Sequence, residues 1–311
     1  MVVGGPDAFL FDGSTWGAPA SLGWAFHVTG ISCPSSSFCM AVDNGGNYST
    51  YSTSGGWTTP AQLLASSRLS GVSCASATFC AALGSGNGTL YTWTGGTWTA
   101  SSVTLGPQFQ YQGTVSCAPG SADFCVAVSG ANAAVYSGGS WSTTPIDTTN
   151  GDLTGVSCPT TSSCVAVDAN GEALTYSGSQ GWSGLTPIDS NASSFGGLPE
   201  YVSCLAAGTC VVSGSDGYAE ILQNGTWSAP TLLGGGGPLG NVSCNSSYCV
   251  IASFASVYYV QQLGGSYGYG FNTSPETAGS ANNFNDFWAS NSCWSSGCML
   301  VSSINTAEEG A

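Results

Sequence analysis

The sequence predicts an all-β fold, a seven-bladed β-propeller with four-stranded blades, and three observations lead to that prediction. Fourteen cysteines fall into seven close pairs, and the first members of successive pairs are 40 to 49 residues apart. Each pair belongs to a unit of short apolar runs separated by Gly-rich turns. The composition is rich in Gly, Ser, Thr, Val, Tyr and Trp, which favour strands and tight turns. Four antiparallel strands in about 40 to 45 residues is the period of a propeller blade.

The four strands of a unit are predicted in order from this repeat. The first strand ends at the first cysteine, as in Val156-Ser157-Cys158, and the second begins at the second cysteine, as in Cys164–Val167. The third strand ends in an aromatic residue. The fourth follows a Gly-rich turn and carries a tryptophan, as in residues 136–141. We interpret the recurring tryptophan as a packing residue of the blades; it occurs at Trp16, Trp57, Trp98, Trp141, Trp182 and Trp227.

The two ends of the chain are predicted to complete one blade together. The C-terminal unit has only its first two strands, and residues 8–16 have the pattern of a third and fourth strand. A closed ring removes the sheet edges that an open array would expose. We therefore expect a single propeller domain over residues 1–311. One blade is shared by residues 1–26 and 287–311, and six complete blades lie between about 27 and 286.

Each cysteine pair is predicted to form a disulfide across the turn between the first two strands. Cysteines with four to seven residues between them can reach disulfide distance in such a turn. The alternatives are reduced thiols and a metal site, but zinc sites use four ligands and often histidine. The chain has one histidine, and its cysteine pairs belong to different blades. The pairs are Cys33–Cys39, Cys74–Cys80, Cys117–Cys125, Cys158–Cys164, Cys204–Cys210, Cys244–Cys249 and Cys293–Cys298.

Charged side chains make up only 5% of the chain, and the balance is acidic. There are 16 Asp and Glu residues, one arginine (Arg68), no lysine and one histidine (His27). Tight nucleic-acid binding needs clustered Lys and Arg, and a Walker-type phosphate site needs a lysine. Both classes are therefore excluded. No apolar run approaches the roughly 20 residues of a membrane-spanning helix, so we expect no membrane span.

The repeat resembles a known type of propeller unit. Residues 156–176 read Val-Ser-Cys-Pro-Thr-Thr-Ser-Ser-Cys-Val-Ala-Val-Asp-Ala-Asn-Gly-Glu-Ala-Leu-Thr-Tyr. This is similar to the disulfide-bearing propeller repeats of secreted or surface proteins of actinobacteria and related bacteria, over nearly the whole chain. The resemblance implies a secreted or cell-surface location, which agrees with the oxidising compartment that many disulfides need. It implies no single activity. The Asp-box motif of sialidases is only faintly echoed, at residues 215–217, which argues against sialidase chemistry.

The loops that cross from one blade to the next are the predicted place for a ligand site. Four of them are long or aromatic: residues 21–30, 105–113, 188–201 and 273–291. Aromatic rings beside Asn, Asp and Glu suit carbohydrate recognition, because they offer an apolar face and hydrogen bonds to hydroxyls. The alternative is that these rings fill the central channel or cover the blades. The candidate ligand-binding residues are Trp24, His27, Phe109, Tyr111, Phe195, Glu200, Tyr201, Phe287 and Trp288.

The remaining acidic residues support weaker expectations. Asp43 and Asp168 follow the second strand of their units, and we expect each to cap its own turn. No metal or cofactor is expected, with calcium at a carboxylate-rich loop as the lesser alternative. No Gly-x-Ser-x-Gly elbow accompanies His27, so no catalytic residue is assigned. A carboxylate pair for glycoside hydrolysis would come from Asp152, Glu200 and Asp286.

Three functions fit these features. The first is an extracellular binding module for a glycan or a surface protein, and it is favoured because catalytic residue types are scarce. The second is a structural or adhesive surface component that assembles with itself. The third is a carboxylate-dependent glycoside hydrolase or lyase. The sequence does not decide the oligomeric state, and enzymatic activity is not expected.

Overall fold

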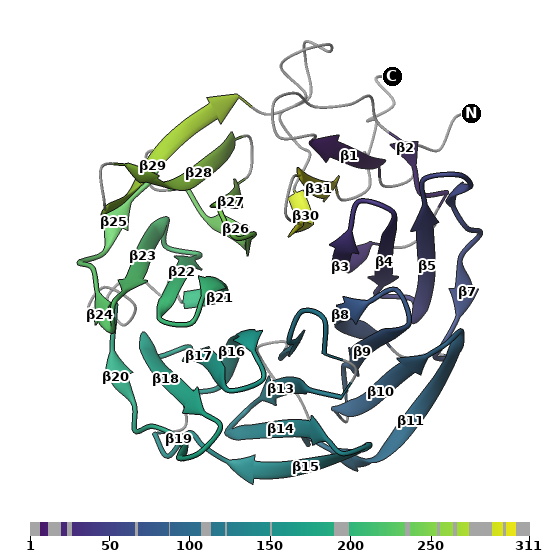
Figure 1. Ribbon diagram of the computed structural model, residues 1–311, viewed down its shortest axis with the longest axis horizontal. Helices are drawn as coiled ribbons and strands as arrows, with labels where there is room; N and C mark the ends of the chain where they lie inside the picture. Colours follow the sequence, from purple (N-terminus) through teal and green to yellow (C-terminus); the bar gives the residue numbers. More distant parts are fainter. Residues whose placement is uncertain are drawn as a thin grey trace, which may run out of the picture.

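The computed structural model consists of β-strands and turns in the residues that it describes. Seven antiparallel sheets are arranged as blades around a central axis (Figure 1). No helix occurs among these residues, so the predicted all-β propeller is confirmed. The described residues are 7–11, 20–23, 27–65, 68–86, 88–106, 113–121, 123–149, 151–189, 199–233, 237–253, 256–263, 266–273, 288–294 and 297–302.

The first four blades follow one another along the chain, and each begins at the centre and ends at the rim. Blade 1 contains β3 (Val28–Ser35), β4 (Phe38–Asp43), β5 (Asn47–Ser52), β6 (Gly56–Trp57) and β7 (Ala61–Gln62). Blade 2 contains β8 (Leu69–Ser76), β9 (Phe79–Gly84), β10 (Thr89–Thr94) and β11 (Thr97–Thr104). Blade 3 contains β12 (Thr114–Cys117), β13 (Cys125–Ser129), β14 (Asn132–Ser137) and β15 (Ser140–Pro145). Blade 4 contains β16 (Leu153–Thr160), β17 (Ser163–Asp168), β18 (Glu172–Ser177), β19 (Gly181–Trp182) and β20 (Thr186–Pro187).

The remaining blades complete the ring. Blade 5 contains β21 (Pro199–Ala206), β22 (Thr209–Gly214), β23 (Tyr218–Gln223), β24 (Thr226–Trp227) and β25 (Thr231–Leu232). Blade 6 contains β26 (Leu239–Cys244), β27 (Tyr248–Ser253), β28 (Ser256–Leu263) and β29 (Ser266–Thr273). Blade 7 contains β30 (Trp288–Trp294), β31 (Gly297–Ser302), β1 (Asp7–Phe11) and β2 (Ala20–Ser21).

Blade 7 is built from both ends of the chain, as the sequence predicts. Its strand order is β2-β1-β31-β30, so the N-terminal strands form its outer half. Strand β1 pairs antiparallel with β31 from Ala8 opposite Val301 to Phe11 opposite Cys298. Figure 1 shows these strands together between blades 6 and 1.

The outer strands of blades 1, 4 and 5 differ from the expected single fourth strand, because each is split into two short pieces. In these blades the residue after the tryptophan is Thr or Ser, and its side-chain hydroxyl accepts a hydrogen bond from a backbone N–H of the third strand. In a continuous outer strand a backbone carbonyl would accept that bond. Thr50 N donates to Thr58 Oγ1, Thr175 N to Ser183 Oγ, and Ile221 N to Ser228 Oγ, each at 3.0 Å. Blades 2 and 3 keep continuous outer strands.

The tryptophans pack within the blades. In blades 1 to 4 the indole lies against the aromatic residue opposite it on the third strand, whereas Trp227 of blade 5 lies opposite Leu222. The ring centroids are 5.3 to 5.5 Å apart in Tyr51–Trp57, Trp93–Trp98, Tyr136–Trp141 and Tyr176–Trp182. Trp141 also donates its indole N–H to Thr92 Oγ1 of the neighbouring blade at 3.1 Å. These tryptophans are therefore structural residues.

All seven predicted disulfides are present, one in each blade. Each joins the first two strands close to the turn between them, with Cα atoms 3.8 to 4.1 Å apart. No free cysteine remains. The disulfides therefore lock the inner half of each blade and make no covalent link between blades. Many disulfides are typical of an oxidising, extracytoplasmic environment.

The Val-Ser-Cys motif is explained by the alternation of side chains along the first strand. Residues two apart share a face of a strand, so Ile31 and Cys33 both pack in the core between blades 7 and 1. Ser32, between them, faces the opposite side and lies against blade 2. Its hydroxyl accepts a hydrogen bond of 2.8 Å from the backbone N–H of Cys74.

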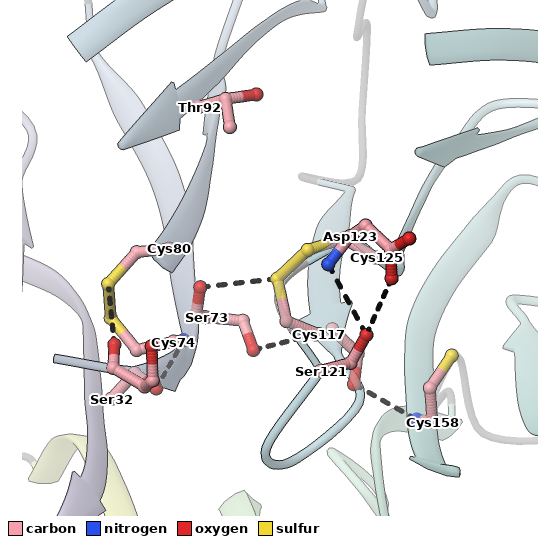
Figure 2. The surroundings of a disulfide bond; sticks show 12 residues. Ser32, Ser73, Cys74, Cys80, Thr92, Cys117, Ser121, Asp123, Cys125 and Cys158 are labelled. Atoms are coloured by element: carbon pink, nitrogen blue, oxygen red, sulfur yellow. Dashed lines mark hydrogen bonds between the residues drawn. A yellow bond between two sulfur atoms is a disulfide. The ribbon is translucent and has the colours of Figure 1, made fainter. Parts of the chain in front are cut away.

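The same link recurs at every blade junction and runs around the whole ring. The first strand of a blade is the edge strand at the central channel, so some of its N–H groups have no partner in their own sheet. Figure 2 shows two successive links, from Cys74 to Ser32 and from Cys117 to Ser73. The other donor–acceptor pairs are Cys158–Ser116, Cys204–Ser157, Cys244–Ser203, Cys293–Ser243 and Cys33–Ser292, and all seven distances are 2.8 to 3.0 Å.

Removing one serine hydroxyl from this ring should destabilise the protein. In Ser157→Ala the buried N–H of Cys204 loses its acceptor, and an unpaired buried donor costs about 1 to 3 kcal/mol. The midpoint of urea unfolding, measured without reductant, should fall accordingly. Ser162→Ala is the matched control, because Ser162 is exposed on the neighbouring turn; its effect should stay within about 0.5 kcal/mol. Equal midpoints for the two variants would contradict the role of the ring.

Candidate functional site

The antiparallel strands give the propeller two different faces. The turns between the first and second strands and between the third and fourth strands lie on one face, with the disulfides; we call it the disulfide face. The turns between the second and third strands and the segments that lead to the next blade lie on the other, the crossing face. Every blade contributes to both faces in the same way.

The acidic residues are concentrated on the crossing face. Ten of the eleven acidic residues that the structure describes lie there, in or beside crossing segments and second-to-third-strand turns. Arg68 and His27 lie there as well, each just before the first strand of a blade. The acidic residues of the crossing face are Asp7, Asp43, Asp147, Asp152, Asp168, Glu172, Asp189, Glu200, Asp216 and Glu220, whereas Asp123 lies on the disulfide face.

Most of these carboxylates belong to a part of the sequence that contains no basic residue. No Lys, Arg or His occurs between residue 69 and residue 311. Carboxylates in blades 3 to 6 therefore have only hydrogen-bond donors, protons and dissolved cations for compensation. Burying a carboxylate without such compensation is costly, so each buried carboxylate needs hydrogen-bond donors or a proton.

The Asp43 turn of blade 1 is a fully satisfied arrangement. Asp43 Oδ1 accepts from the backbone N–H groups of Gly45 and Asn47 at 2.9 and 2.7 Å. Asp43 Oδ2 accepts from the side-chain amide of Asn47 at 2.8 Å. The expectation that Asp43 caps its own turn is confirmed, and both carboxylate oxygens have donors.

The equivalent turn of blade 4 has the same cap and lacks one donor. Asp168 Oδ1 accepts from the N–H groups of Asn170 and Glu172 at 3.0 and 2.8 Å, so its predicted capping role is also confirmed. Glu172 replaces the asparagine of blade 1, and Asp168 Oδ2 is buried with no hydrogen-bond partner. Asp168 is completely buried. Burial, with Coulomb repulsion from Asp147 and Glu172, raises its pKa from 3.8 to about 6.

The crossing segment between blades 3 and 4 brings a second buried carboxylate to this turn. Asp147 Oδ1 accepts from Thr149 N at 2.7 Å, and Asp147 Oδ2 accepts from Gly151 N at 2.8 Å. The single hydroxyl hydrogen of Thr149 is within reach of two acceptors, Asp147 Oδ1 at 2.9 Å and Glu172 Oε2 at 3.2 Å. Both oxygens of Asp147 therefore have backbone donors, and the oxygen of this group that has none is Asp168 Oδ2.

A second group lies at the junction of blades 4 and 5. Glu220 is 1% exposed, and its Oε1 has no hydrogen-bond partner. Burial, with Coulomb repulsion from Asp189 and Asp216, raises the pKa of Glu220 from 4.5 to about 9. Glu220 lies opposite Val212 in the sheet, and Val212 is two residues after the second cysteine of blade 5. In blade 4 the residue at the equivalent position is the buried Leu174. An acid thus occupies a core position of the repeat.

The predicted ligand-binding residues lie in different parts of the structure. His27 is exposed beside β3, and Tyr201 is half-buried against the core between blades 5 and 6. Glu200 and Trp288 lie in β21 and β30, and their side chains are outside the described part. The structure therefore does not test whether these residues come together. Trp24, Phe109, Tyr111, Phe195 and Phe287 lie outside the described residues.

The structure likewise does not test whether the three predicted hydrolase carboxylates come together, because the side chain of Glu200 lies outside the described part. Asp152 lies in the crossing segment before β16, with a left-handed backbone (φ 52°). Asp286 lies outside the described residues. The residues that sequence reasoning missed are Asp147, Asp189 and Glu220. Aligning the units by their second cysteine would have found Glu220, because ten residues after that cysteine the other complete units have Ser, Leu, Val, Leu or Tyr.

Within the described residues, no group of three or more His, Cys, Asp and Glu side chains has an arrangement that could hold a metal ion. The same part of the chain contains no helix long and apolar enough to cross a membrane.

Comparisons with known proteins identify the fold and no family. No protein-family model matches the chain, and no curated protein matches it. Among solved structures, the WD40 repeats of RRP9 superpose with a TM-score of 0.70 at 9% identity, over 97% of this chain and 100% of that one. U3-55K superposes with a TM-score of 0.67 at 10% identity, over 96% and 100%. At such low identity the likeness shows a WD40-type propeller fold alone.

Substitution of Gly151 should reveal how tightly the Asp147 segment covers Asp168. A Cβ at residue 151 would overlap Asp168 Oδ2, so Gly151→Ala should lose about 1 to 3 kcal/mol of unfolding free energy through overpacking. Gly184→Ala is the matched control, because its Cβ would meet nothing within 4 Å. Thermal unfolding of both variants at one pH measures the difference. A Gly151→Ala protein as stable as the control would show that the segment does not close over the carboxylate.

Proposed function

We propose that this protein is a binding module of the extracytoplasmic space that takes its ligand on the crossing face. One observation carries the proposal: ten of the eleven described acidic residues lie on that face, although every blade contributes turns to both faces. Repetition alone would distribute charge evenly. Two of these acids, Asp168 and Glu220, are buried without full hydrogen bonding. Departures from the local rules of a repeat concentrate at functional sites.

Carbohydrate is the proposed ligand class. The sequence predicts aromatic residues in several of the segments that cross between blades. Carboxylate and amide oxygens accept hydrogen bonds from sugar hydroxyls, and aromatic rings stack on the apolar face of a sugar. Seven disulfides in a chain without free cysteine support a location outside the reducing cytosol.

A glycan-array screen, with and without calcium, tests the ligand class. We expect binding to a defined glycan group and at least about a fivefold loss of affinity in His27→Ala, because His27 is exposed on the crossing face. Ser36→Ala, exposed on the disulfide face, is the matched control and should bind like the unmodified protein. An array without hits in both conditions would remove carbohydrate as the ligand. Equal losses in the two variants would remove the crossing face as the site.

Self-assembly at the cell surface is a second candidate function, and one strand favours it. The outer strand β11 of blade 2 is eight residues long and uncharged, and it contains no proline. Its rim position leaves a row of backbone groups open to another strand. Light scattering over a concentration series should then show association that Thr99→Lys reduces and Ser36→Lys, on the disulfide face, does not. A strict monomer at all concentrations would exclude this function.

A further inference from the structure

On each side of blade 4 a group of carboxylates contains a buried acid with one oxygen that has no hydrogen-bond partner, Asp168 on one side and Glu220 on the other. At its junction with blade 3 the group is Asp147, Asp168 and Glu172. At its junction with blade 5 the group is Asp189, Asp216 and Glu220. We infer that each group binds a proton in the folded state, and that loss of these protons as pH rises loosens the crossing face on both sides of blade 4.

The geometry of the first group favours a proton over a larger cation. Asp168 Oδ2 lies so close to Gly151 that a Cβ there would overlap it. The three carboxylates of this group have no arrangement that holds a metal ion. The hydrogen of Thr149 serves either Asp147 or Glu172 and leaves the other without it. A proton on Asp168 removes the buried negative charge without needing space.

Blade 1 supplies an internal control for this interpretation. Its turn has the same backbone cap, and Asn47 stands where blade 4 has Glu172. The amide of Asn47 donates to the second oxygen of Asp43 at 2.8 Å. The equivalent oxygen of Asp168 has no partner. One exchange, amide for carboxylate, thus converts a satisfied turn into one that needs a proton.

The second group also contains a buried acid that needs a proton, but the reason is different. Glu220 belongs to the face of β23 that packs against blade 4, because Leu222, two residues further along, lies in the core between blades 4 and 5. The charged groups that face it are Asp189, from the segment after β20, and Asp216, from the turn before β23. Both are acidic, and no basic side chain occurs in the sequence after Arg68. Ionised Glu220 would therefore be a buried charge without a counter-charge.

The sign of the effect follows from the direction of the pKa shifts. Both acids bind their proton more tightly in the folded than in the unfolded chain, from 3.8 to about 6 for Asp168 and from 4.5 to about 9 for Glu220. At pH values between the lower and the higher pKa of each acid, the folded state holds more protons than the unfolded state. The free energy of unfolding therefore falls as pH rises. Asp168 contributes to this fall up to about pH 6 and Glu220 up to about pH 9.

Thermal unfolding at pH 5 and pH 8 tests the proton sites by stability. The unmodified protein should lose about 5 °C or more in unfolding temperature between these values. Glu220→Gln and Glu172→Asn should each reduce that loss, and Asn47→Glu should increase it by copying the blade 4 turn into blade 1. Asp123→Asn, which removes an exposed carboxylate from the disulfide face, is the matched control and should leave the loss unchanged. If Glu220→Gln and Asp123→Asn behave alike, the inference is wrong.

Two further measurements detect the protons and their effect without an unfolding experiment. Infrared difference spectroscopy at pH 7 should show a protonated carboxyl group in the unmodified protein and lose it in Glu220→Gln. Hydrogen exchange, corrected for intrinsic rates, should show that the amides of Asn170 and Glu172 lose protection between pH 5 and pH 8 relative to those of Gly45 and Asn47. No protonated band, or equal protection of the two turns at both pH values, would overturn the inference.

Discussion

Seven hydrogen bonds from cysteine N–H groups to serine hydroxyls link each blade to the one before it, and the arrangement of the ring depends on them. The disulfides act only within blades, so the junctions are held by these bonds and by apolar packing between neighbouring sheets. The link between Cys33 and Ser292 is the one that joins blade 1 to the blade shared by both chain ends. A short dipeptide, Ser-Cys, therefore supplies the covalent lock of one blade and the acceptor for the next.

The two faces of the propeller therefore have different roles. Disulfides, short turns and the serine links lie towards one face and repeat in every blade, so variation there would weaken the ring. The crossing face carries segments of different length and most of the acids. The turns of blades 1 and 4 share one aspartate cap but differ at a single position, where blade 1 has Asn47 and blade 4 has Glu172. A rigid repeated face thus supports a face on which individual residues can be changed for binding.

Much of the fold could be predicted from the sequence, and less of the site. Cysteine spacing predicts the number of blades and all seven disulfides, because each pair lies in one turn. The role of Ser157 as an acceptor depends on Cys204 of the neighbouring blade, 47 residues away, which spacing alone does not place. Glu220 stands out only when it is compared with Leu174 at the same repeat position. The crossing loops with Trp24 or Phe195 have no repeat pattern, so sequence comparison between blades gives no information about them.

The pairing of cysteines also bears on how the chain reaches its native state during oxidation. Fourteen thiols permit a very large number of connectivities, yet every native bond joins the nearest cysteine neighbours along the chain, five to eight residues apart in sequence. Each bond can form as soon as its own hairpin forms, without waiting for distant segments to meet. Random pairing is therefore avoided by proximity, because closing a short loop costs less entropy than closing a long one. The pairing of β1 with β31 in blade 7 is different, because it joins segments from the two ends of the chain and no disulfide assists it.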